Sequence, residues 1–144
     1  MTAFASVLGA IVAALSAQPR IAHVIESNPR RNVNESLPTC IAVHLGKTQP
    51  DDRRTLGVMR WKTHITVECY ARGGVDGLID RAWSRLLGPD AQISAAGHVG
   101  IEGIELIGID WDYDELGSDL ACAALQLLVQ HRTLPTSLNS WTPY

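Results

Sequence analysis

The chain has 144 residues, which is enough for one domain with a substantial core, and it is 46% hydrophobic and 19% charged. The formal net charge of -3 is too small to indicate nucleic-acid binding or a solvated acidic tail. Cys40, Cys69 and Cys122 lie in apolar runs and form no CxxC pair, which favours reduced, buried thiols over a disulfide framework.

Residues 1–19 carry no charged side chain, and their apolar residues recur at helical spacing. A signal peptide is the alternative, but no Lys or Arg precedes the apolar stretch, and Leu15 stands where a small residue is usual before a cleavage site. We therefore expect a helix over residues 2–17, capped by Thr2. Because its second face consists of small residues, we expect it to be buried against the sheet and against a second subunit.

Two short strands are expected next, at residues 21–25 and 39–45. Between them, residues 26–38 contain two prolines and many polar residues, which is typical of a loop. Residues 46–55 are polar and carry adjacent opposite charges. We expect this segment to be a mobile hairpin connection.

The longest pattern is a strand over residues 59–71, followed by a helix. Alternate residues of the strand are apolar or small, namely Met59, Trp61, Thr63, Ile65, Val67, Cys69 and Ala71, and the residues between them are polar. Gly73 and Gly74 end this alternation. One helical stripe then comprises Leu78, Ile79, Ala82, Trp83, Leu86 and Leu87. Gly88-Pro89 is expected to end the helix.

The last third of the chain reads as a hairpin. Residues 90–98 form a loop, residues 99–113 a strand, residues 115–119 a turn, and residues 120–132 a return strand. Ile107, Ile109, Trp111 and Tyr113 share one face of the first strand. The return strand is apolar on both faces, which is typical of a strand in the centre of a sheet.

These elements predict a single α+β domain over residues 1–132, followed by an extended tail over residues 133–144. The domain is expected to hold a mostly antiparallel sheet of four to five strands, with two helices packed on one face. The side chains expected in the core are Trp61, Ile65, Val67, Trp83, Leu86, Ile107 and Ile109.

Two charged rows are the main candidates for a functional surface. The acidic row is Asp110, Asp112 and Asp114, and the basic row is Arg60, Lys62 and His64. Side chains on one strand face are spaced almost 7 Å apart, so three carboxylates in a row do not converge on one ion. We therefore expect no metal site. The rows are expected to face water, to pair across neighbouring strands, or to meet across subunits.

No catalytic motif occurs in the chain. The five histidines are scattered, no GxSxG sequence is present, and the glycines near residue 98 do not form a phosphate-binding loop. We therefore expect no cofactor, and these residues point to no active site.

The order of elements resembles the tail terminators, a minor tail protein family of long-tailed bacteriophages. The resemblance lies in WKTHITVECYARGGVDGLIDRAWSRLL and GIEGIELIGIDWDYDELGSDLACAALQLLVQHRT, together with the N-terminal helix and the strand LPTCIAVHLG. It covers nearly the whole chain. It implies a structural protein of a phage or prophage, without enzymatic activity, that forms a homo-oligomeric ring, commonly a hexamer, during virion assembly in the host bacterial cytoplasm. Such a ring caps the tail tube and joins it to the head.

The implied partners are the chain itself, the tail tube protein and the head-completion protein, with no membrane and no sequence-specific nucleic acid. Candidate interface residues are the two charged rows, Arg53 and Arg54 in the polar loop, and Trp141 in the tail. Two alternatives stay open. One is another head–tail joining or tail-completion component, and the other is a small cytosolic enzyme or ligand-binding domain with its site at the acidic row.

Overall fold

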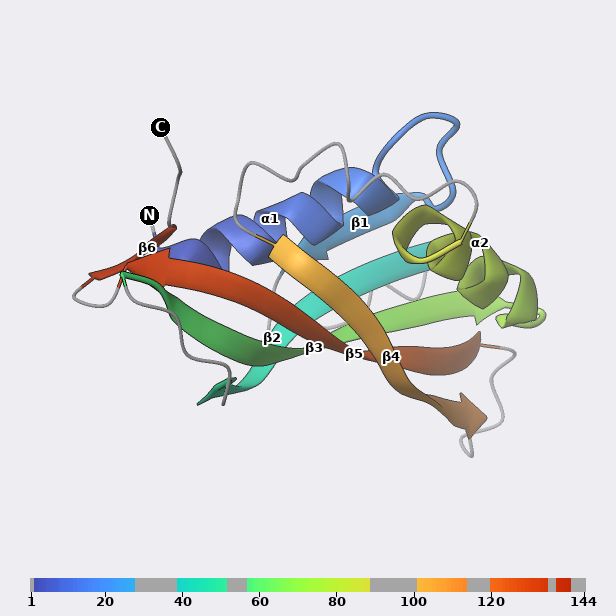
Figure 1. The fold of residues 1–144 in the computed structure, drawn as a ribbon. Helices are drawn as coiled ribbons and strands as arrows, with labels where there is room; N and C mark the ends of the chain where they lie inside the picture. Colours follow the sequence, from blue (N-terminus) through green and yellow to red (C-terminus); the bar gives the residue numbers. More distant parts are fainter. Residues whose placement is uncertain are drawn as a thin grey trace.

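The computed structural model describes residues 2–27, 39–51, 57–88, 101–113, 120–134 and 137–140. The elements in chain order (Figure 1) are α1 (Ala3–Leu15), β1 (Val24–Ser27), β2 (Thr39–Pro50), β3 (Met59–Arg72), α2 (Asp76–Leu86), β4 (Ile101–Tyr113), β5 (Leu120–Leu134) and β6 (Ser137–Ser140). The expected α+β class is confirmed. Within the described ranges, no helix is long and apolar enough to cross a membrane.

The strands form one six-stranded sheet in the order β1-β2-β3-β5-β4, with β6 paired to β5. β2, β3, β5 and β4 are antiparallel to their neighbours, whereas β1 runs parallel to β2, with Val24 opposite Cys40. The sheet is mostly antiparallel, as expected, but the expected count of four to five strands is wrong, because six strands form the sheet and β1 joins it in parallel. Parallel neighbours need a long connection, and the interval from Ser27 to Thr39 is long enough to supply one.

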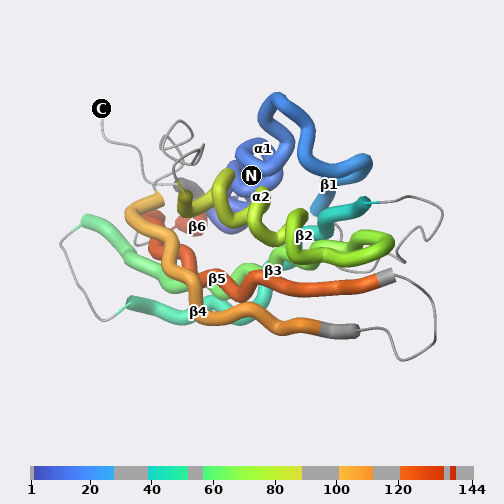
Figure 2. Tube along the Cα trace, turned by 90° about the vertical axis from the view of Figure 1, so that its right-hand side faces the viewer, coloured from blue at the N-terminus to red at the C-terminus, as the bar shows by residue number. Residues whose placement is uncertain are grey.

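Both helices lie on the same side of the sheet, as expected (Figure 2). One continuous core joins the helices to the inward-facing residues of β2, β3 and β5. The largest fully buried side chains are Ile11, Leu15, Ile41, Ile65, Leu78, Leu125, Leu127, His131, Val7, Val43, Val67 and Val75. The return strand, β5, lies between β3 and β4, which confirms its predicted central position.

α1 begins as its sequence predicts. The side chain of Thr2 accepts a hydrogen bond from the backbone N–H of Ala5 at 3.3 Å, which satisfies one of the free donors of the first turn. Val7, Ile11 and Leu15 are fully buried on the face toward the sheet. The opposite side of the helix exposes small residues, and Gly9 has open space where a side chain would be.

Glycines set the turn into α2 and the end of that helix. Gly73 and Gly74 have φ values of 76° and 131°, in the left-handed region that L side chains avoid, so the chain can leave β3 sharply. At the other end, a Cβ on Gly88 would lie 2.8 Å from the Cα of Ser84. Glycine is therefore required here by close packing against the last turn of the helix.

The polar segment predicted as a loop over residues 46–55 is partly strand. β2 continues to Pro50, and the backbone N–H of Asp51 donates to the carbonyl of Arg60 at 2.9 Å. The register shifts between Leu45 and Thr48, so a β-bulge interrupts the alternation that the sequence reading relied on. These residues are polar because this part of the hairpin is mostly exposed. Residues 52–56 lie outside the described residues.

Ile107, predicted in the core, is 58% exposed. Leu106 pairs with Leu127 and Gly108 with Gln126, so β4 carries one extra residue between them. A bulge shifts the phase of the alternation, so Ile107 leaves the inward face that Leu106 and Ile109 share. No regular two-residue pattern predicts such a shift.

The two tryptophans predicted in the core, Trp61 and Trp83, are only partly buried. Trp83 is 36% exposed because the buried stripe of α2 is rotated toward Arg85, which leaves Trp83 at its rim. Trp61 is half-buried, and its indole N–H donates to Thr133 Oγ1 at 2.9 Å. Ile65, Val67 and Leu86 are buried as expected, and Ile109 packs against the core.

Two aspartate substitutions test this assignment of faces. Ile65→Asp places a carboxylate in the centre of the core, so we expect a loss of about 4 kcal/mol or more and aggregation or unfolding. Ile107→Asp should change the free energy of unfolding by no more than about 0.5 kcal/mol, because its side chain already faces solvent. Urea denaturation of both variants makes the comparison. An unfolded Ile107→Asp variant would show that the bulge is misplaced.

Candidate functional site

The sheet face opposite the helices, here called the open face, carries the basic row and Asp110 of the acidic row. In β3 the even-numbered residues from Arg60 to Tyr70 lie on it, since their odd-numbered neighbours from Thr63 to Ala71 are buried under the helices. The register across β5 places Asp110 on the same face, level with Glu68. The basic row and Asp110 therefore share one surface.

Among the residues that the structure describes, the two rows do not pair with each other inside one subunit. β5 separates β3 from β4, and the rows are also offset along the strands. Lys62 is level with Gln130 of β5, whereas Asp110 is level with Ala124, six positions away. At about 3.3 Å per residue this offset is roughly 20 Å. The basic row thus occupies one end of the open face and the acidic row the other.

The three members of the basic row differ in their surroundings. Arg60 Nε donates to both carboxylate oxygens of Glu102 on β4, at 3.0 and 3.2 Å. Lys62 makes no hydrogen bond or ion pair with any described residue. The ring of His64 packs against Gly46, where a Cβ would lie 3.1 Å from His64 Nδ1. Lys62 is therefore the cation of this row that is left for another molecule.

In the acidic row, Asp110 Oδ2 accepts a hydrogen bond from Gln126 Nε2 at 2.9 Å, and Gln126 Oε1 accepts one from Thr66 at 2.9 Å. The backbone of Asp112 lies opposite Cys122, which is the same face of β4 as Asp110. Asp114, together with Arg53, Arg54 and Trp141, falls outside the described residues. Asp110 is thus held in a chain of side chains that crosses β4, β5 and β3.

Glu68 joins two further side chains at the acidic end. Tyr70 donates its hydroxyl hydrogen to Glu68 Oε2 at 2.7 Å, and His44 Nε2 lies 3.3 Å from the same oxygen. Burial of the phenol, and then its hydrogen bond to Glu68, hold the pKa of Tyr70 well above its usual value. The hydroxyl of Tyr70 is therefore protonated at neutral pH, where it donates to the Glu68 carboxylate and cannot act as a general base.

The cysteines near this end are free thiols, with Cys40 and Cys69 buried and Cys122 half-buried. Desolvation is the main cause that raises the pKa of Cys69 to about 12, with smaller contributions from the negative charges of its neighbours. A thiol with so high a pKa is a poor nucleophile. Among the residues that the structure describes, no group of His, Cys, Asp or Glu is arranged to hold a metal ion.

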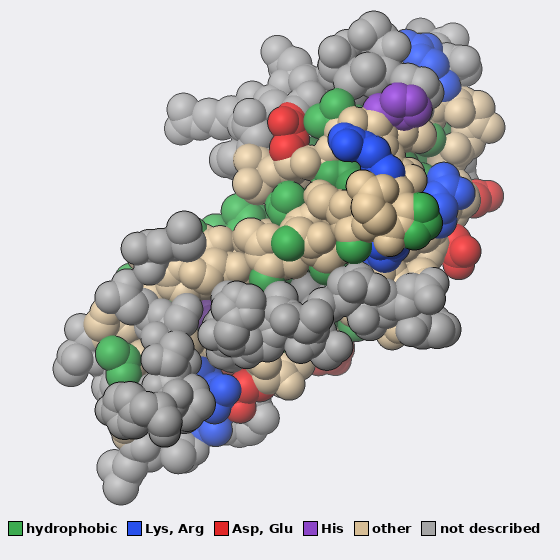
Figure 3. All heavy atoms as spheres, turned by 90° about the horizontal axis from the view of Figure 1, so that it is seen from above, with side chains coloured by type: hydrophobic (Ala, Val, Ile, Leu, Met, Phe, Trp, Pro, Cys, Tyr) green, Lys and Arg blue, Asp and Glu red, His purple; other side chains and the backbone are tan. Residues whose placement is uncertain are grey.

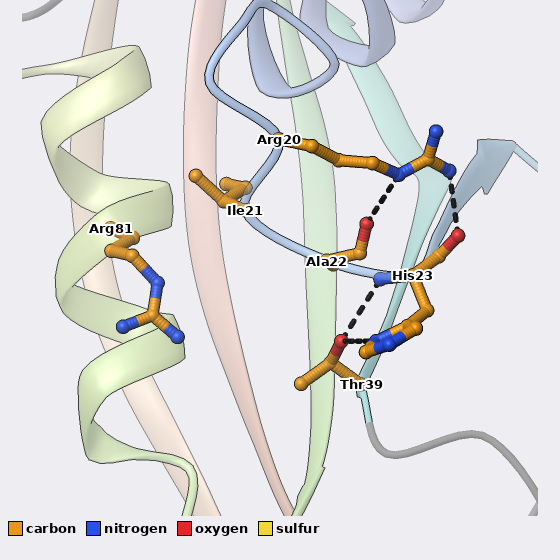
Figure 4. Close-up of a pocket in the computed structure, with 6 residues that line it drawn as sticks. All are labelled: Arg20, Ile21, Ala22, His23, Thr39 and Arg81. Atoms are coloured by element: carbon orange, nitrogen blue, oxygen red, sulfur yellow. Dashed lines mark hydrogen bonds between the residues drawn. The ribbon is translucent and has the colours of Figure 1, made fainter.

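A second feature, missed by sequence reasoning, lies on the helix side. A hollow of about 430 Å³ is lined by Arg20, Ile21, Ala22, His23, Thr39 and Arg81 (Figure 4). Seen from the helix side, most of the visible Lys, Arg and His side chains lie toward one end of the molecule, with Asp and Glu side chains at its margin (Figure 3). Nothing in the local sequence signals this site, because α2 brings Arg81 to a segment that is distant in sequence.

Arg85, one turn along α2 from Arg81, connects the two helices. It is 6% exposed, and its guanidinium donates to the carbonyls of Ala17 and Pro19 at 2.7 and 2.5 Å. These carbonyls follow the end of α1, where backbone acceptors lack helical partners. The sequence held one signal for this contact, because Arg85 falls within the spacing of the apolar stripe of α2.

In comparisons with known proteins, no family model matches the chain, and no curated protein matches it significantly. The function is therefore inferred from the two surfaces just described and from the resemblance in the order of elements.

His131 is a third polar group, buried in the core beneath α1. Its side chain is 0% exposed, its Nε2 lies 2.7 Å from Thr63 Oγ1, and its ring meets that of Phe4 edge to face at 5.3 Å. Its Nδ1 is buried without a hydrogen-bond partner among the described residues. Burial lowers the pKa of His131 to about 4, and the negative charge of Glu102 opposes this shift.

The lowered pKa of His131 predicts acid sensitivity. Between pH 6.5 and 4 the unfolded chain binds the proton and the folded chain excludes it, so the stability that is present at pH 7 is lost as the pH falls. The expected loss is about 3 kcal/mol by pH 4. Urea denaturation of the wild type and of His131→Gln measures the difference between their pH profiles. Parallel profiles would assign the acid sensitivity to other groups.

Proposed function

We propose that the chain is a structural, non-enzymatic subunit of a phage or prophage tail. In this proposal it is a tail terminator, whose copies form a ring, commonly a hexamer, that caps the tail tube and joins it to the head. Its partners are other copies of itself, the tail tube protein and the head-completion protein. It acts in the virion tail, after assembly in the cytoplasm of the host bacterium.

The observation that carries the proposal is the distribution of charge on the open face. A closed ring of identical subunits requires two different, complementary surfaces on each subunit, one for each neighbour. The open face has Lys62, a cation that pairs with no residue the structure describes, at one end, and Asp110 and Glu68 at the other. Because these ends are offset along the sheet, they can meet only between molecules, and opposite charges favour a head-to-tail contact.

Apolar side chains at the sheet margin support the same reading. Ile107 on β4 is 58% exposed where the bulge turns it away from the core, whereas Trp111, 45% exposed, lies opposite the buried Ala123 and so on the helix side of the same edge. β4 ends the strand order, and no other described strand pairs with its outer edge. An unpaired edge with large apolar side chains is a common site of association between chains.

The enzyme alternative placed a site at the acidic row. Asp110 is engaged by Gln126, and its neighbouring row positions lie along one strand, so the described geometry offers no convergent set of carboxylates. The alternative of another head–tail joining component shares the open-face surface with our proposal. Assembly with purified tail tubes separates it, since only a terminator stops further growth of the tube.

Charge reversal tests the head-to-tail contact. The wild type should elute from a sizing column far above the 15.6 kDa of one chain when tubes or high concentration drive assembly. Lys62→Glu should weaken assembly by about 1 kcal/mol per contact at low salt, where attraction between exposed charges is least screened. Lys62 is chosen over Arg60 because Arg60 already pairs with Glu102 within the subunit.

Adding Asp110→Lys to Lys62→Glu should partly restore the ring, because the two ends would again carry opposite charges. Lys47→Glu makes the same charge change at an exposed position outside both rows and should assemble as the wild type does. Normal assembly of Lys62→Glu at low salt, with its fold intact by circular dichroism, would rule out the open-face charges as the contact.

A further inference from the structure

We propose that the hollow between α2 and the segment after α1 is a binding site for an oxyanion, of the carboxylate or phosphate class. The proposal concerns the helix side of the molecule and does not depend on ring formation. Of the described residues, six line the hollow, and they include two arginines and one histidine but no acidic residue.

Arg81 is the residue that would contact the ligand. In Figure 4 its guanidinium extends from α2 toward Ala22 and Thr39 across the hollow. It makes no hydrogen bond or ion pair with any residue that the structure describes. Its neighbour Asp80 lies about 100° further round the helix and does not pair with it. A guanidinium fork that is free in this way matches the two oxygens of a carboxylate or phosphate.

The opposite wall is held in place by its own hydrogen bonds. Arg20 donates from Nε to the carbonyl of Ala22 at 2.7 Å and from Nη2 to the carbonyl of His23 at 2.6 Å. Thr39 Oγ1 accepts from the backbone N–H of His23 at 2.9 Å and lies 2.7 Å from its Nδ1. When this hydroxyl donates to Nδ1, His23 Nε2 carries the proton and becomes a second donor. The wall is therefore preorganised before any ligand binds.

No described carboxylate pairs with the arginines at this hollow. Arg20 is fixed by carbonyls, which order a guanidinium but leave its net charge in place. Arg85, one turn along α2 from Arg81, is buried and also donates to carbonyls, with no carboxylate contact among the described residues. A buried cation is weakly screened, so its field extends into the hollow. Ile21 and Ala22 add an apolar floor, which suits an acid with a short hydrocarbon part.

Isothermal titration calorimetry of the full chain tests the site with three probes at constant ionic strength. They are inorganic phosphate, propionate, and a short glutamate peptide with blocked ends. Binding of phosphate or propionate would identify a free small anion as the ligand, whereas binding of the peptide alone would identify an acidic side chain of a protein partner. Absence of binding by all three probes would refute the site.

Variants of exposed residues assign any binding to the hollow. Arg81→Gln should weaken binding about tenfold or more, the loss expected for a charge-assisted hydrogen bond. Arg81→Lys should bind with intermediate strength, because it keeps the charge and loses the fork. Lys47→Gln removes one exposed charge elsewhere and should bind as the wild type does. Equal weakening in Lys47→Gln and Arg81→Gln would show general charge attraction and refute the assignment.

Discussion

The structure depends on the pairing of β3 with β5. Every residue of β3, from Met59 opposite Thr133 to Arg72 opposite Leu120, has a partner on β5 without a register shift. Since side chains alternate between the two faces of a strand, this register fixes which residues are buried and which are exposed. A slip of one position would turn Ile65 and Val67 outward and bring Lys62 and Glu68 under the helices. The register between β3 and β5 therefore determines both the side chains that pack under the helices and the side chains that lie on the open face.

The two surfaces differ because different forces shape them. On the helix side, apolar burial dominates, and polar groups are tolerated where they gain specific partners, as Arg85 does at the end of α1. On the open face, hydrogen bonds run from strand to strand, from Thr66 through Gln126 to Asp110. These bonds order the acidic end, whereas at the basic end Lys62 bonds to none of the described residues. A surface with two unlike ends is what an asymmetric contact between identical chains requires.

Regular alternation and helical spacing were sufficient to predict β3, α1, α2, the central place of β5 and the α+β class. The sequence reading failed where the chain departs from regular geometry. The bulge in β2 interrupts the alternation after Leu45, so the alternation predicts a strand that is too short. The bulge in β4 turns Ile107 outward. The parallel pairing of β1 depends on a long connection that carries no directional signal. The charged rows were found because they follow the strand period, whereas the hollow at Arg81 depends on tertiary packing alone.

The central claim is that the open face, and not the helix layer, is covered when subunits associate. Hydroxyl-radical footprinting of free and tube-assembled protein measures it directly, by comparing oxidation of Ile107 and Trp83. Both are exposed in the single subunit, Ile107 beside the open face at the bulge of β4 and Trp83 on α2. We expect Ile107 to be protected on assembly while Trp83 is oxidised as before. Protection of Trp83 with unchanged oxidation of Ile107 would contradict the claim and place the contact on the helices.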